Sequence, residues 1–101
     1  GIQPKTPGFD IAIIKPQMSK LKNSTITVPT LKGAIKGKYQ FVNRRLQKYT
    51  IEIPANMVAE FKLVDTAGKE VKLNGKSVST AFGTIRLLPG VNQIDLVINS
   101  F

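Results

Sequence analysis

Residues 49–63 limit the fold more strongly than any other stretch of this chain. They read Tyr-Thr-Ile-Glu-Ile-Pro-Ala-Asn-Met-Val-Ala-Glu-Phe-Lys-Leu, with an apolar side chain at every second position on both sides of a break. Because successive side chains of a strand leave opposite faces of a sheet, this alternation indicates two half-buried strands. Pro54 has no N–H for a sheet ladder and Asn56 tolerates turn geometry, so the break predicts a corner. The apolar faces that should share one core are Tyr49, Ile51 and Ile53 before the corner and Ala59, Phe61 and Leu63 after it.

Short apolar or alternating runs bounded by Pro, Gly and Asn continue along the chain, and no segment shows a helical period. Asn74-Gly75 is a two-residue hairpin signal, and Pro89-Gly90 fits the central pair of a type II turn. Gly33 and Gly37 interrupt one long run and suggest a bulge or bend there. Strands are expected at 9–15, 24–28, 30–42, 46–53, 57–65, 71–73, 76–80, 84–88 and 93–101. This spacing predicts an all-β fold, a single-domain antiparallel two-sheet β-sandwich of jelly-roll-like type.

The chain has 101 residues, which fits one domain or a piece of a larger protein. Residues 1–8 contain two prolines and two glycines without a pattern, so we expect a linker or a cloning remnant followed by a sandwich domain at 9–101. No apolar run approaches the ~18 residues of a membrane span, and no signal peptide is expected within this stretch.

The net charge of +9, from 15 Lys and Arg against 6 Asp and Glu, raises the question of a nucleic-acid partner. The lysines occur singly along the expected strands at solvent-facing positions, and Arg44-Arg45 is the only adjacent basic pair. This distribution favours a solvated surface that also discourages edge pairing. We therefore expect no nucleic-acid partner. Weak binding of polyanions, which would fall steeply with added salt, is kept as an alternative function.

The side chains available for catalysis are few. Without His or Cys the chain lacks the usual zinc ligands, the usual general base and the cysteine nucleophile. Glycosidases use two carboxylates, and Glu52 and Glu60 flank the Pro54 corner, where they could be neighbours. Exposed carboxylates beside lysines have no burial to raise a pKa, so we favour a solvated surface pair. We expect no catalytic, cofactor-binding or metal-binding residue.

Aromatic residues are the usual platforms for sugars, and this chain has no Trp. Tyr39, Phe41, Tyr49 and Phe61 fall at inward positions, which favours core packing. Phe9 and Phe82 have no clear place in the pattern.

Several stretches, taken in order, resemble the C-terminal β-sandwich domain of bacterial α-L-rhamnosidases, especially the Bacteroides-type enzymes of glycoside hydrolase family 78. The order and rough spacing hold from Pro7 to about Val78. Tyr39 stands where that family often has Trp, and residues 89–96 match its closing segment only loosely. The matching stretches are Pro7-Gly8-Phe9 with Ile13-Ile14-Lys15-Pro16-Gln17, residues 30–38 with Gly33 and Ile35, Ile53-Pro54-Ala55-Asn56 with Val58-Ala59, and Leu73-Asn74-Gly75-Lys76.

The resemblance implies a fragment of a secreted or periplasmic glycosidase that removes terminal α-L-rhamnose from glycans with inversion. In that family the catalytic acids belong to an α/α barrel, so no catalytic residue carries over and the fragment alone is not expected to be an enzyme. Its expected partner is that barrel. The alternative is an autonomous carbohydrate-binding module. Under either reading Phe9, Tyr39 and Phe82 are the candidate contacts with carbohydrate or with the neighbouring domain.

Overall fold

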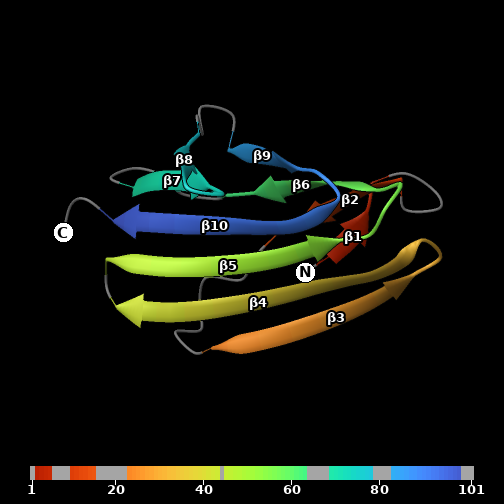
Figure 1. Ribbon diagram of the computed structural model, residues 1–101, viewed down its shortest axis with the longest axis horizontal. Coiled ribbons are helices and arrows are strands. Elements are labelled where there is room, and N and C mark those ends of the chain that lie inside the picture. Colours follow the sequence, from red (N-terminus) through yellow and green to blue (C-terminus); the bar gives the residue numbers. More distant parts are fainter. Residues whose placement is uncertain are drawn as a thin grey trace.

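All the regular structure that the described residues form is β-strand, which confirms the all-β prediction (Figure 1). The computed structural model describes residues 2–5, 10–15, 23–43, 45–63, 69–78 and 83–98, without the side chains of Lys69 and Ile98. The strands are β1 (Ile2–Pro4), β2 (Ile11–Ile14), β3 (Ser24–Thr30), β4 (Gly33–Asn43), β5 (Leu46–Ile53), β6 (Val58–Lys62), β7 (Lys69–Leu73), β8 (Lys76–Ser77), β9 (Thr84–Leu87) and β10 (Gly90–Ile98).

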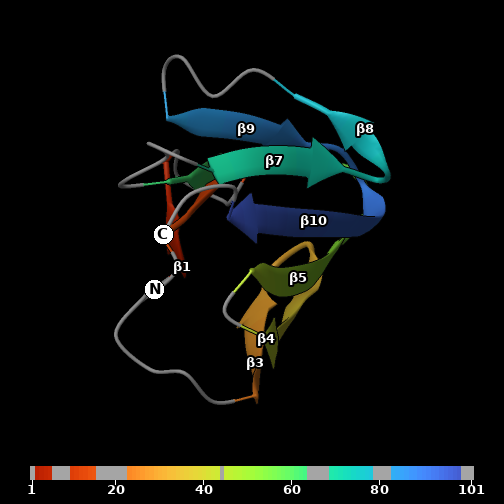
Figure 2. The ribbon, with the colours of Figure 1, turned by 90° about the vertical axis from the view of Figure 1, so that its left-hand side faces the viewer.

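The strands form two sheets that stack as the layers of a sandwich (Figure 2). A four-stranded sheet has the order β1-β2-β6-β9, and a six-stranded sheet has the order β3-β4-β5-β10-β7-β8. In Figure 1, β3, β4, β5 and β10 cross the front of the molecule, β1 and β2 lie behind them, and β6 and β9 are seen above β10. The predicted two-sheet sandwich is therefore confirmed.

One strand pair departs from the antiparallel prediction. β2 pairs with β6 in parallel, with Ala12 opposite Ala59, whereas the other pairs are antiparallel. Between β2 and β6 the chain forms β3, β4 and β5 in the other sheet and then returns, so the two strands meet without a hairpin. Parallel neighbours need such a long crossover connection.

The corner predicted at Pro54 carries the chain from one sheet to the other. β5 ends at Ile53, Ala55 and Asn56 form the turn, and β6 begins at Val58. Asn56 has a φ of 64°, a left-handed conformation that Asn tolerates better than most residues. Because β5 belongs to the six-stranded sheet and β6 to the four-stranded one, the corner turns both apolar faces toward the same core.

The predicted hairpin turn at Asn74-Gly75 occurs. Asn74 and Gly75 have φ values of 52° and 86° between β7 and β8, as a type I′ turn requires. Asn74 also ties the hairpin to β10: its N–H donates to the Gln93 carbonyl, and its Oδ1 accepts from the Gln93 N–H, both at 2.8 Å. Gly90, which follows Pro89 and begins β10, has a φ of 106°.

The core lies between the sheets and is built from the alternating apolar positions. Phe61 from β6 and Tyr49 from β5 meet at its centre, where their ring centroids are 5.2 Å apart. Two polar residues, Gln47 and Asn92, are buried beside it. The buried apolar side chains are Ala12, Ile14, Ile35, Tyr49, Ile51, Ile53, Met57, Ala59, Phe61, Val71, Ile85, Leu87, Ile94 and Leu96.

Some local predictions are wrong. Ile2–Pro4 form β1 and pair with β2, so this part of residues 1–8 belongs to a sheet and is not a linker. The alternation of residues 24–28 places Ile26 on the core side, but Ile26 is 50% exposed, because β3 is the edge of the six-stranded sheet and extends past the four-stranded one (Figure 2). Pro29 does not end β3, since an edge strand tolerates proline. The β4–β5 register shifts between Phe41 and Asn43, not at a glycine.

Candidate functional site

The structure describes one of the three sequence-predicted contact residues. Tyr39 on β4 packs against Tyr49, with ring centroids 5.0 Å apart and a 45° interplanar angle. Burial raises the pKa of the Tyr39 phenol, which fits a ring at the edge of the core. Phe9 and Phe82 lie outside the described residues. A role for these three residues in binding carbohydrate or a neighbouring domain remains a prediction.

Glu52 and Glu60 are not neighbours. Each points outward, but from different sheets, so the two carboxyl groups lie on opposite sides of the sandwich. The corner at Pro54 separates them because it moves the chain between layers. The Glu60 carboxylate binds Lys5 at 2.8 Å and Lys62 at 3.6 Å. The hydrogen bond from Lys5 is the main cause of its lowered pKa, the opposite of what a general acid needs.

A trough of about 290 Å³ lies on the outer face of the six-stranded sheet. It crosses β3, β4, β5 and the start of β10, and its walls come from the polar positions of the strand alternation. In register, Thr27 lies opposite Lys36, Lys36 opposite Glu52, and Glu52 opposite Val91. The lining residues are Thr25, Ile26, Thr27, Lys36, Gly37, Lys38, Thr50, Glu52 and Val91.

The charged side chains that face each other in the trough, Lys36 and Glu52, do not form an ion pair with each other. They lie opposite each other across β4 and β5. The ion pairs among the described residues lie elsewhere: Lys5–Glu60, Lys62–Glu60 and Lys32–Asp10. Val91 is 64% exposed beside them and adds an apolar surface. The trough therefore offers ammonium, carboxylate, hydroxyl and methyl groups together.

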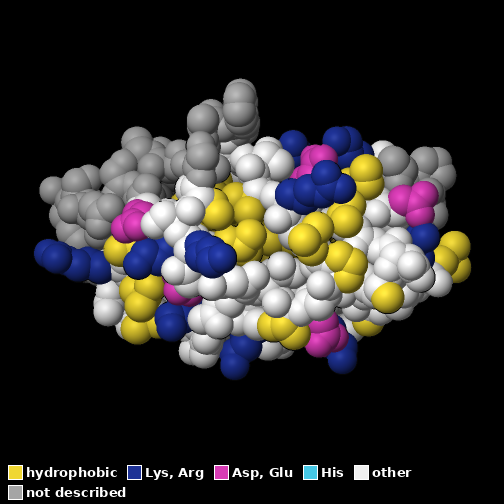
Figure 3. Space-filling model, turned by 45° about the horizontal axis from the view of Figure 1, so that its top comes forward, with side chains coloured by type: hydrophobic (Ala, Val, Ile, Leu, Met, Phe, Trp, Pro, Cys, Tyr) yellow, Lys and Arg dark blue, Asp and Glu magenta, His cyan; other side chains and the backbone are white. Residues whose placement is uncertain are grey.

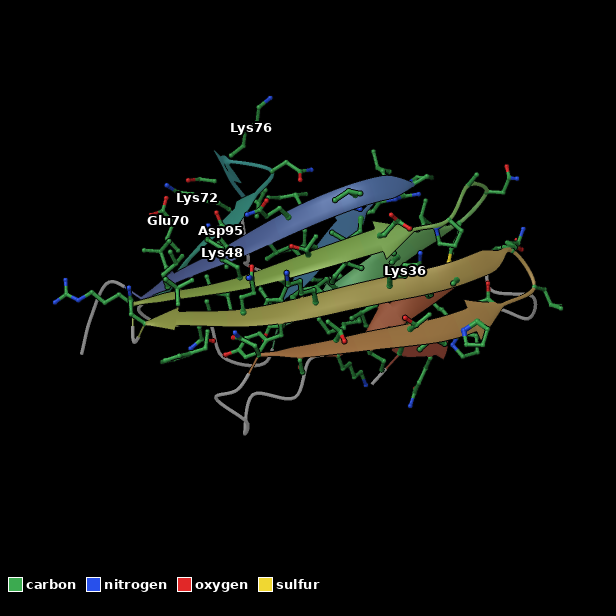
Figure 4. The ribbon with its side chains drawn as sticks, turned by 60° about the horizontal axis from the view of Figure 1, so that its bottom comes forward. Lys36, Lys48, Glu70, Lys72, Lys76 and Asp95 are labelled. Carbon is green, nitrogen blue, oxygen red and sulfur yellow. The ribbon has the colours of Figure 1, made fainter. Side chains whose placement is uncertain are left out.

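A second group of charges lies on the same face, toward the other edge of the sheet. Asp95 on β10 stands between Lys48 on β5 and Lys72 on β7 (Figure 4). Its Oδ1 is buried and makes no hydrogen bond within the part of the chain that the structure describes. Glu70 accepts a 2.6 Å hydrogen bond from the Ser77 hydroxyl. Figure 4 shows this group well separated from Lys36.

The outer face of the four-stranded sheet carries apolar side chains where a water-facing sheet would carry polar ones. Ala12 and Ile14 of β2 point into the core, so Ile11 and Ile13 point outward, and both are half-buried. Val58 of β6 lies directly opposite Ile11 and is also half-buried. We call Ile11, Ile13 and Val58 the apolar stripe. Its charged surroundings are Lys5, Glu60, Lys62 and, opposite Glu60, Arg86.

The positive charge is not gathered into one patch on the face that Figure 3 shows. On the face shown in Figure 3, dark blue side chains stand in small groups separated by white and yellow ones. A nucleic-acid surface would gather them into a patch or stripe. Within the described ranges, no helix could cross a membrane, and no three acidic side chains gather as a metal site would require.

The fold defines the class of protein: an all-β domain in which two stacked sheets form a sandwich. The sequence matches the family model of the bacterial alpha-L-rhamnosidase C-terminal domain over residues 1–78. The chain therefore belongs to that family. A search of curated proteins found no significant match.

Solved structures share the fold at low identity. The α-L-rhamnosidase from Dictyoglumus thermophilum aligns with a TM-score of 0.80 and 19% identity over 96% of this chain and 12% of its own. The Streptomyces avermitilis α-L-rhamnosidase, solved with L-rhamnose, aligns with a TM-score of 0.71 and 19% identity over 93% of this chain and 9% of its own. A GH127 β-L-arabinofuranosidase from Geobacillus stearothermophilus aligns with a TM-score of 0.60 and 15% identity over 88% of this chain and 15% of its own. This chain thus spans a small part of each.

Sequence reasoning missed the trough. It assigned Lys36 and Glu52 correctly to solvent-facing positions, but treated Lys36 as a single solvated lysine and paired Glu52 with Glu60. The signal that could have found the trough is the set of polar alternate positions on adjacent strands, with Thr25 and Thr27 followed by Lys36 and Lys38. Using it requires the register between the strands, which the sequence alone does not supply.

Proposed function

We propose that this chain serves as the accessory domain of an α-L-rhamnosidase-like glycoside hydrolase and packs on the catalytic α/α barrel of its parent protein. The family match over residues 1–78 carries this proposal. The rhamnosidases that share the fold are much longer, with this chain covering 12% and 9% of them. The parent enzyme would remove terminal rhamnose in carbohydrate breakdown and act outside the cell or in the periplasm.

The apolar stripe is the surface best suited to face the barrel. A strand exposed on its outer face should alternate between apolar and polar residues, whereas strands covered on both faces read as continuous apolar runs. β2 reads Ile-Ala-Ile-Ile, a continuous apolar run of the kind found in strands that are covered on both faces. With Val58 on the neighbouring strand, it gives an apolar centre, and Lys5, Glu60, Lys62 and Arg86 give a charged rim. An apolar centre inside a polar rim is the usual anatomy of an interface.

The experiment compares the full-length parent enzyme with two variants, using an aryl α-L-rhamnoside as substrate. Ile13→Glu places a carboxylate in the apolar stripe and should shorten the half-life of activity at raised temperature by at least about fivefold, because an unpaired charge would be buried at the interface. Leu31→Glu, between β3 and β4 of the opposite sheet and 95% exposed, is the matched control and should change the half-life less than about twofold.

The isolated chain supplies the remaining measurements. It should show no turnover of the aryl rhamnoside. Ile13→Glu should lower its own melting temperature only slightly, because Ile13 points away from its core, although the new carboxylate stands opposite Glu60. Turnover by the isolated chain, or equal half-lives for the two parent variants, would contradict the proposal.

A further inference from the structure

We propose that the trough on the six-stranded sheet binds an acidic saccharide, a glycan segment that carries uronate carboxylates. This goes beyond docking on a catalytic domain and does not depend on it, since the trough and the apolar stripe lie on opposite faces of the sandwich.

The size of the trough fits a short saccharide segment. Its volume of about 290 Å³ is at the lower end of the range for small-molecule sites. It crosses four neighbouring strands, a width of about 14 Å at the usual strand spacing of about 4.8 Å. The outward side chains of Lys36 and Lys38 are two positions apart on β4, which places their backbone attachment points about 7 Å apart. The site is therefore open and elongated, as a polymer passing through it would need.

The lining chemistry matches a ring that carries both hydroxyls and a carboxylate. The ammonium groups of Lys36 and Lys38 donate hydrogen bonds to a uronate, and hydrogen bonds between charged groups are the stronger kind. Glu52 accepts from sugar hydroxyls, and the threonine hydroxyls both donate and accept. Val91 gives the C–H face of a ring an apolar contact.

The charge balance selects the acidic class of saccharide. Two ammonium groups and one carboxylate leave the trough with a net positive charge, and Lys36 is not paired with the Glu52 that faces it. A uronate carboxylate placed against Lys36 and Lys38 would balance the positive charge of the trough, while Glu52 accepts hydrogen bonds from the hydroxyls of the sugar. A neutral saccharide would leave both ammonium groups without an anionic partner.

Glu52 also distinguishes an acidic saccharide from a polyanion that is bound by charge attraction alone. A DNA backbone presents no hydroxyl donors of the kind that a sugar ring offers, so the Glu52 carboxylate would repel it. Nucleic-acid sites for single strands use aromatic side chains on which bases stack, and the trough has none. The two ligand classes therefore predict opposite effects when the charge of Glu52 is removed.

The test titrates this chain with a tetramer of galacturonate at low salt, following binding by calorimetry and by amide chemical shifts. We expect saturable binding at one site, with the largest shifts on β3, β4 and β5 around the trough. The methyl-esterified tetramer has the same rings without the charge and should bind at least about fivefold more weakly.

Three variants locate the site. Lys36→Gln should weaken binding at least about fivefold, and Glu52→Gln at least about threefold, because each loses a hydrogen bond to a charged group. Lys76→Gln removes the same charge from β8, at the other edge of the sheet, and should change the affinity less than about twofold (Figure 4). Lys36, Glu52 and Lys76 are exposed, so the melting temperature of each variant should match that of the parent sequence.

Three results would overturn the proposal. The first is no saturable binding of the galacturonate tetramer by the unsubstituted chain. The second is an equal loss for Lys36→Gln and Lys76→Gln. The third is tighter binding by Glu52→Gln together with comparable affinity for single-stranded DNA, which would mean general polyanion attraction. None of these alters the rhamnoside turnover or the half-life of the parent enzyme, so failure here leaves the docking proposal standing.

Discussion

The ring of Tyr49 packs edge-on against the ring of Phe61, with centroids 5.2 Å apart and an interplanar angle of 67°. The two residues come from different sheets, β5 and β6, on either side of the corner at Pro54. Tyr39 extends the contact from β4, at 5.0 Å from Tyr49. Edge-to-face aromatic pairs add stabilisation beyond the area they bury. This aromatic group therefore joins the two layers inside the core, several residues away from the corner in both strands.

Phe61→Ala should destabilise the domain by about 3 to 5 kcal/mol, since Phe61 is fully buried and its loss leaves a cavity between the sheets. Phe61→Leu refills most of that volume and should cost about 1 to 2 kcal/mol. Urea unfolding followed by circular dichroism gives both free energies. Leu31→Ala, at a position that is 95% exposed, is the control and should have almost no effect. A loss below about 1 kcal/mol for Phe61→Ala would show that this ring does not join the layers.

Stability should fall in strongly alkaline solution because of Tyr49. Burial, assisted by the nearby Tyr39, raises the pKa of the Tyr49 phenol from 10.0 to about 12. The unfolded chain ionises this phenol first, so the stabilisation is complete below pH 10 and is lost as the pH rises from 10 toward 12. The loss should reach roughly 2 kcal/mol.

The measurement for Tyr49 is the free energy of unfolding at several pH values, with phenolate absorbance recorded in parallel. Tyr49→Phe keeps the ring and removes the titration, so its stability should decline less than that of the parent sequence over the same interval. Lysine deprotonation affects both proteins alike. Identical pH profiles would contradict the assignment.

Gly33 and Gly37 both lie on β4 but should respond differently to alanine. Gly33 has a φ of 123°, and an added Cβ would stand 3.0 Å from Pro54 Cβ, so Gly33→Ala should cost about 1 to 3 kcal/mol. At Gly37 an added Cβ would meet Ile26 Cγ2 at 3.1 Å. Ile26 is 50% exposed on an edge strand and can turn away, so Gly37→Ala should change stability by less than about 0.5 kcal/mol. Thermal unfolding of the matched pair measures the difference, and equal losses would refute it.

Asn92 holds the β9–β10 turn from inside the core. Its Nδ2 donates to the Leu88 carbonyl at 2.8 Å and the Gly90 carbonyl at 3.2 Å, and lies 3.5 Å from the Ile51 carbonyl. Asn92→Ala should cost about 1 to 3 kcal/mol because these buried acceptors lose their donor. Asn92→Asp should be worse at neutral pH, since a carboxylate would face carbonyl oxygens, and should recover part of the loss in acid as it becomes protonated. Urea unfolding at pH 7 and pH 4 tests both variants, and Asn92→Asp being the milder change at pH 7 would contradict the hydrogen-bond pattern.

The sequence predicted local features well where a short stretch decides them. Residues 46–53 were expected to form a strand and do so as β5, with Tyr49, Ile51 and Ile53 buried as the alternation requires. The Asn74-Gly75 turn follows from the need for positive φ at two successive positions. These predictions succeed because they depend on backbone conformations that neighbouring residues fix between themselves.

Predictions that needed a partner far along the chain were less successful. Ile26 has the alternation of a core residue, but its exposure depends on whether the other sheet covers β3. Ile13 is an apolar residue of the kind usually found in a core, but it points outward because Ala12 and Ile14 take the inner positions of β2. The candidate contacts proposed from the aromatic residues did not include the polar positions of the trough, since lysine and threonine at alternate positions look like any solvated strand.

The sequence by itself determined that this chain forms short strands, where most of them lie, which turns join the hairpins, and which family it resembles. Only the tertiary structure decided that β2 pairs in parallel with β6, that Glu52 and Glu60 lie on opposite sides, and that Lys36, Glu52 and Val91 share one trough. The physical reason is range: side-chain alternation is a property of one extended strand, whereas register and layering depend on which distant strand supplies the hydrogen bonds and which sheet covers the face.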